Sequence, residues 1–134
     1  MHSEHLNNLH PGWAVGGWLV SVAVTSVLYL AMVGLGLVPM GALAALAVIV
    51  AMAVGFYAGG LFVGFRWSNA PILHGAAITF LSILVWFLGS LASPGSFRPW
   101  SDSAPVVPGI LLLQFIASSA GGWTGHRVAG GDGD

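Results

Sequence analysis

Long apolar blocks separated by short polar segments dominate the chain. The four blocks, at residues 13–38, 42–65, 71–92 and 108–127, contain almost no charged residue. Each reaches the roughly 20 residues that a helix needs to cross a ~30 Å hydrocarbon core. Membrane-spanning strands would instead alternate apolar and polar side chains over about ten residues. The pattern therefore predicts an all-α integral membrane protein with four transmembrane helices.

Polar segments delimit the predicted helices. Residues 1–12 form a polar N-terminal segment, and residues 129–134 form a flexible acidic tail. Pro39 and Gly41 predict a tight turn after the first helix, and Pro71 suits the first turn of the third. We expect one transmembrane domain over residues 13–128. We expect no signal peptide, because the first apolar block is too long for one.

Small residues recur at helical spacing in the second and fourth blocks. In lipid, such a stripe, of the GxxxG type, lets two helix backbones approach closely. The predicted helix-packing residues are Ala47, Ala51, Gly55, Gly59, Gly60, Gly64, Ala117, Gly121 and Gly125, and Ala129 extends the last stripe.

The two glycine-rich segments resemble each other. An Ala-Gly-Gly run at 58–60 precedes Gly64 and Arg66, and a second at 120–122 precedes Gly125 and Arg127. This similarity predicts two parallel helical-hairpin repeats around a pseudo-twofold axis along the membrane normal. The second and fourth helices would pack at that axis through their small-residue stripes. Chance recurrence of common membrane residues is the alternative.

Composition narrows the function classes. Charged residues make up 5% of the chain, against roughly 25% in soluble domains. The net charge of −1 and the absence of cysteine argue against nucleic-acid binding, disulfides and thiolate chemistry. The chain has no HExxH sequence, and its glycine-rich segments lack the lysine of a P-loop. We therefore expect no enzyme and no metal site.

Five polar residues are the candidates for a ligand or polar site: His74, Arg66, Gln114, His126 and Arg127. His74 either hydrogen-bonds the turn before the third helix, responds to pH near Arg66, or ligates haem or a chlorophyll-type pigment. A site made by His74 and His126 is a further alternative. The two arginines end their helices, where cations are favoured, or they form an anion site between the repeats.

Gln114 falls near the middle of the fourth helix. An amide at that depth needs a protein partner, because lipid offers none. We expect a hydroxyl on another helix; the candidates are Ser21, Thr25, Thr79 and Ser82. The alternative is that Gln114 lines a path for a substrate or water.

Arginine placement predicts the orientation. With four spans, Arg66 and Arg127 share one side with both termini, and Arg98 lies on the other. The positive-inside rule then places both termini in the cytoplasm.

The Gly-Gly-x3-Gly segment with Arg66, followed by His74-Gly75, resembles a group of small, uncharacterised bacterial membrane proteins. Those proteins carry a Gly-Gly-x3-Gly-Arg segment and then a His-Gly pair; here Phe65 separates Gly64 from Arg66. The resemblance implies four helices and a bacterial inner membrane, and it implies no established activity.

These observations favour a non-enzymatic accessory or structural subunit that packs in the bilayer against itself or a larger membrane complex. A homo-oligomeric channel or small-solute carrier is the first alternative, with Gln114 on its path. A pigment- or haem-binding subunit using His74 is the second.

Overall fold

The computed structural model describes residues 6–38, 44–66, 70–92 and 106–131. Four α-helices follow one another: α1 (Pro11–Gly34), α2 (Ala44–Arg66), α3 (Pro71–Ala92) and α5 (Val106–His126). Each is long and apolar enough to cross a membrane. No strand occurs among the described residues. The predicted all-α, multi-pass fold is confirmed.

The first helix is shifted toward the N-terminus relative to its predicted span of 13–38. It begins at Pro11, whose ring suits the first helical position. It ends at Gly34 because Gly36, at φ +67°, closes the helix. The Gly36 amide donates to the Val33 carbonyl at 3.0 Å, and the Leu37 amide donates to Met32 at 2.9 Å. This pair of bonds is a Schellman motif.

The other boundaries differ less. The predicted 42–65 helix is observed as Ala44–Arg66, with 42 and 43 outside the described residues, and the third helix keeps its predicted span. The fourth begins two residues before the predicted 108 and continues past His126 as a π-helical turn, Arg127–Gly131. Residues 129–131 of the predicted flexible tail lie in this segment, and Gly130 breaks its helical geometry with φ +94°.

Glycines bring the backbones of α2 and α5 into contact. A Cβ at Gly60 would overlap the Ser118 carbonyl, and a Cβ at Gly121 would overlap the Tyr57 carbonyl. One turn further on, Gly64 faces Gly122 and Gly125 faces Leu61 in the same way. These contacts form matching pairs in which the two helices exchange roles and corresponding positions are 61 residues apart. The contact of Gly60 with Ser118 matches that of Gly121 with Tyr57, and the contact of Gly64 with Gly122 matches that of Gly125 with Leu61. The predicted two-hairpin repeat requires such reciprocity, and it stays a prediction.

The other small-residue row of α2 faces α1, not α5. A Cβ at Gly55 would overlap Thr25, and a Cβ at Gly59 would overlap Ser21. Ala47 and Ala51 of the same row are buried. The expected packing of the small-residue stripe of α2 on the fourth helix therefore holds for Gly60 and Gly64, and not for Gly55 and Gly59. In α5, Ala117 packs partly buried near Phe56, while Ala129 is exposed, so that stripe ends at Gly125.

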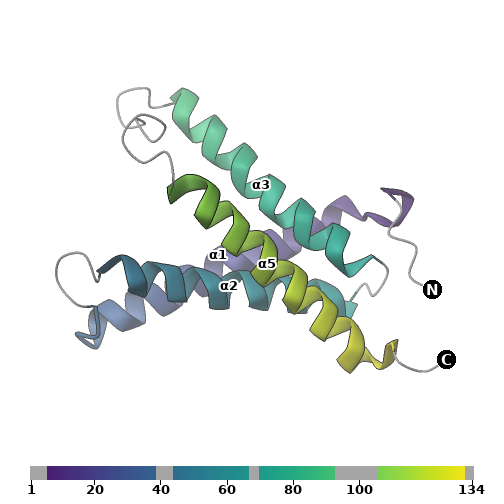
Figure 1. Ribbon diagram of the computed structural model, residues 1–134, viewed down its shortest axis with the longest axis horizontal. Coiled ribbons are helices and arrows are strands. Elements are labelled where there is room, and N and C mark those ends of the chain that lie inside the picture. The colour runs from purple at the N-terminus through teal and green to yellow at the C-terminus, as the bar shows by residue number, and fades with distance from the viewer. Residues whose placement is uncertain (1–5, 39–43, 67–69, 93–105, 132–134) are drawn as a thin grey trace.

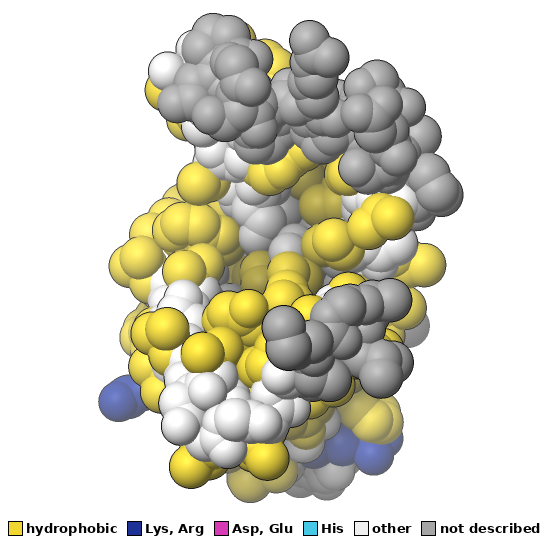
Figure 2. All heavy atoms as spheres, turned by 90° about the vertical axis from the view of Figure 1, so that its left-hand side faces the viewer, with side chains coloured by type: hydrophobic (Ala, Val, Ile, Leu, Met, Phe, Trp, Pro, Cys, Tyr) yellow, Lys and Arg dark blue, Asp and Glu magenta, His cyan; other side chains and the backbone are white. Residues whose placement is uncertain are grey.

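The two hairpins meet at one end and diverge at the other. Figure 1 shows the start of α1, the end of α2, the start of α3 and the end of α5 gathered together, with the chain ends on that side. The opposite ends of α1–α2 and α3–α5 spread apart. Figure 2 looks onto this open end, which is hollowed at its centre and lined by hydrophobic side chains.

Candidate functional site

Two neighbouring pockets lie toward the open end of the molecule. The first has a volume of about 320 Å³ and lies between α3 and α5. The second, of about 280 Å³, is bounded by all four helices. Both are lined by Ser82, Trp86 and Gln114. Ile83, Val107, Ile110 and Leu111 complete the first; Trp18, Val22, Thr25, Ser26, Met52, Phe56 and Val85 complete the second.

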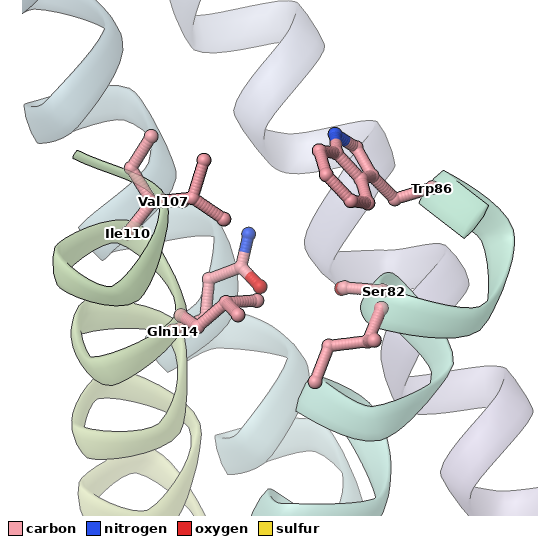
Figure 3. Close-up of a pocket in the computed structure, with 7 residues that line it drawn as sticks. Ser82, Trp86, Val107, Ile110 and Gln114 are labelled. Atoms are coloured by element: carbon pink, nitrogen blue, oxygen red, sulfur yellow. The ribbon is translucent and has the colours of Figure 1, made fainter. Parts of the chain in front are cut away.

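Gln114 is one of the two residues with an uncharged polar side chain, beside Ser82, that both pockets share. Its side chain projects from α5 into the space facing Ser82 and Trp86 of α3 (Figure 3). The residue is 7% exposed. Its Nε2 donates to the Met52 sulfur at 3.4 Å, while its Oε1 is buried without a hydrogen-bond partner among the described residues. This contact places the amide nitrogen toward α2 and leaves the oxygen unsatisfied. The hydrogen bond is weak, because a thioether sulfur is a weak acceptor.

The expected hydroxyl partner of Gln114 is wrong. The Ser21 hydroxyl donates to the Gly17 carbonyl at 2.9 Å, and the Thr25 hydroxyl donates to the Ser21 carbonyl at 2.7 Å. Thr79 likewise donates to the Gly75 carbonyl. Hydroxyls in helices commonly bond the carbonyl one turn back. They are thereby used within their own helices, and the amide meets a sulfur instead.

Ser82 takes part in a contact between helices. Its Oγ accepts a hydrogen bond from Trp18 Nε1 at 3.1 Å and donates to the Ile78 carbonyl at 3.4 Å. A buried indole N–H usually finds a partner of this kind. The Ser118 hydroxyl makes a second contact between helices, sharing its one proton between the Gln114 carbonyl of its own helix at 2.7 Å and the Gly75 carbonyl of α3 at 3.0 Å. Sequence reasoning missed both bonds; for Trp18, the signal was an indole donor within an apolar block.

His74 joins the starts of two helices. The residue is 1% exposed. Its Nδ1 donates to the Ala70 carbonyl at 2.9 Å, and its Nε2 accepts from the His10 backbone N–H at 3.2 Å. The first bond is the predicted one to the turn before the third helix. Because both ring nitrogens are engaged, the arrangement does not fit an axial ligand, which needs a free nitrogen lone pair.

The remaining candidates lie at the closed end. Arg66 is exposed at the last position of α2. Arg127 is also exposed, and its guanidinium lies 3.5 Å from the centre of the Trp123 ring, a cation–π contact within one helix end. His126 is 5% exposed. The described residues contain no cluster of three or more His, Cys, Asp or Glu side chains. Arg98 lies outside the described residues.

No protein-family model, curated protein or solved structure matches the chain. The resemblance to small four-helix bacterial membrane proteins therefore stays a prediction.

Proposed function

We propose that this protein is a non-enzymatic membrane protein that binds a small hydrophobic molecule in the two pockets around Gln114. One observation carries the proposal: Oε1 of Gln114 is buried without a hydrogen-bond partner while its side chain lines both pockets. An unsatisfied buried acceptor costs about 1–3 kcal/mol. A ligand that donates a hydrogen bond to this oxygen recovers that free energy. If the amide had only a structural role, the cost would not be offset.

The character of the lining favours a hydrophobic molecule over a hydrated solute. The described walls are aliphatic and aromatic apart from a few hydroxyls and one amide. Of the hydroxyls, Thr25 and Ser82 already bond carbonyls of their own helices. A hydrated ion or sugar would find few partners there. A ligand that enters from the lipid phase therefore fits these pockets better than the aqueous solute of a channel or small-solute carrier.

Ligand-dependent stability in nanodiscs tests the binding function. We expect 2-naphthol or farnesol to raise the unfolding temperature, because a ligand that binds only the folded state stabilises it by RT ln(1 + [L]/Kd). Leu111→Trp, which fills the first pocket, should weaken binding at least about tenfold. Leu112→Trp is the matched control, because Leu112 is exposed and outside both pockets. Equal binding by both variants would contradict the proposal.

An accessory subunit that packs against itself or a larger membrane complex is the second candidate. The divergence of the hairpins favours it, since a partner's helix would have room at the open end (Figure 2). Native mass spectrometry after mild extraction tests this candidate. A pure monomer without co-purifying subunits would argue against it. We further propose a bacterial inner membrane, with both termini cytoplasmic.

A further inference from the structure

We propose that the ligand is a neutral, largely apolar molecule whose hydroxyl group donates a hydrogen bond to Oε1 of Gln114. This inference rests on the proposed binding function and names the chemistry of its ligand. Two sources share that chemistry: a long-chain alcohol from the membrane and a free ring alcohol such as a phenol.

The hydrogen-bonding capacity of the site calls for a donor. Oε1 of Gln114 accepts no hydrogen bond from the described part of the chain, while Nε2 already donates to Met52. The Ser82 hydroxyl donates its only proton to Ile78 and accepts from Trp18. A ligand hydroxyl satisfies the amide oxygen. A ketone or ether brings only another acceptor and leaves Oε1 unpaired.

The charge of the site calls for a neutral ligand. The described residues that line the two pockets include no Asp, Glu, Lys, Arg or His. An ion brought into such surroundings loses its hydration and finds no counter-ion, which is strongly unfavourable. A carboxylate, phosphate or ammonium group is thereby disfavoured inside the pockets.

The size of the site calls for a small apolar body. The first pocket, at about 320 Å³, lies near the lower end of the roughly 300–1,000 Å³ typical of ligand sites. Trp86 offers an aromatic wall, and Ile83, Ile110 and Leu111 offer aliphatic ones. A fused pair of rings or a branched hydrocarbon chain suits these walls.

Two matched pairs of probes test the inference: 2-naphthol with 2-methoxynaphthalene, and farnesol with its methyl ether. Each ether keeps the apolar body and removes the donor. We expect the wild-type protein in nanodiscs to bind each alcohol about 2- to 12-fold more tightly than its ether, the range that one neutral hydrogen bond supplies. Dissociation constants come from quenching of tryptophan fluorescence, since Trp18 and Trp86 line the site.

Gln114→Met identifies the acceptor. Methionine keeps the length of the side chain and removes the amide oxygen, so this variant should bind alcohol and ether equally. Its stability should not fall, because the change removes a buried acceptor that has no partner. Preference for the alcohol in Gln114→Met would show that another group accepts the bond and would overturn the inference.

The outcomes in the wild-type protein separate the two proposals without any variant. Equal binding of alcohol and ether would overturn the donor assignment and leave the binding function standing. Binding of none of the four probes would overturn the binding function itself. Preference within the farnesol pair alone would support the inference and point to a membrane alcohol, and preference within the naphthol pair alone would point to a free ring alcohol.

Discussion

At the scale of single residues, His74 and Gln114 show two fates of a polar side chain in an apolar fold. His74 has a partner for each ring nitrogen, whereas one atom of the Gln114 amide has none. In lipid, unpaired polar groups are costly and tend to mark functional positions. His74 therefore explains how the chain is held together, and Gln114 suggests what it does.

The bonds of His74 lead to a prediction for stability. His74→Leu removes two hydrogen bonds and leaves the His10 N–H without its acceptor. We expect it to lower the free energy of unfolding by roughly 1–3 kcal/mol, measured by SDS titration in mixed micelles. Phe80→Leu is the control, because Phe80 lies in the same helix as His74 and is 62% exposed; it should cost about 0.5 kcal/mol or less. Similar losses in both variants would contradict a stabilising role for the two hydrogen bonds of His74.

At the scale of elements, the contact between α2 and α5 depends on missing side chains. The helices approach so closely that even one methyl group at Gly121 would overlap the Tyr57 carbonyl. Such proximity allows dispersion and weak Cα–H···O contacts, which bind helices where lipid removes the hydrophobic drive. The interface is therefore sensitive to volume and insensitive to hydrophobicity.

Two glycines of α5 test this sensitivity. Gly121→Ala should lower the free energy of unfolding by about 1–3 kcal/mol, the usual cost of overpacking. Gly109 lies in the same helix with nothing within 4 Å of an added Cβ. Gly109→Ala should therefore be neutral or raise stability by up to about 1 kcal/mol, because alanine favours helix. If the two variants unfold alike in SDS titration, the backbones do not touch at Gly121.

The end of α1 provides a second pair of glycines. Gly36 adopts φ +67° and forms the Schellman closure, whereas Gly34 is the last helical residue and has open space around it. We expect Gly36→Ala to cost about 1–2 kcal/mol, since L side chains disfavour the left-handed region. Gly34→Ala should be neutral or stabilising. Unfolding of the two variants under the same conditions decides the matter, and a Gly36→Ala protein as stable as wild type would place the helix end elsewhere.

At the scale of the whole molecule, an even number of spans brings both chain ends to the closed end (Figure 1). The pockets lie toward the opposite end, where the hairpins spread. A hydrophobic ligand would then enter from the lipid between the hairpins, without passing His74 at the closed end. Orientation therefore decides in which half of the bilayer the ligand is taken up.

Single introduced cysteines measure that orientation, because the chain has none of its own. Asn7→Cys and Val128→Cys should react alike with a membrane-impermeant maleimide, and Leu35→Cys, at the other end of α1, should react oppositely. If both termini are cytoplasmic, only the Leu35→Cys protein is labelled in intact cells. Labelling of both Asn7→Cys and Val128→Cys, without Leu35→Cys, would reverse the orientation. Different labelling of the two terminal positions would contradict the fold.

Some features of this protein follow from the sequence by itself, and others from the tertiary structure alone. Each apolar block carries its own membrane affinity, so the number of helices and the span of α3 were readable locally. The hydroxyl partner predicted for Gln114 is wrong. The sequence also does not predict the bond from His10 to His74, which lie 64 residues apart. Nor does it predict that the glycines of α2 are divided between two partner helices. Lipid surrounds every helix with the same apolar medium, so the helices need no amphipathic pattern. The sequence therefore does not indicate which side of each helix faces the interior. Rotation and crossing are decided only when all the helix surfaces fit together, and that fit leaves an amide oxygen unpaired beside a pocket.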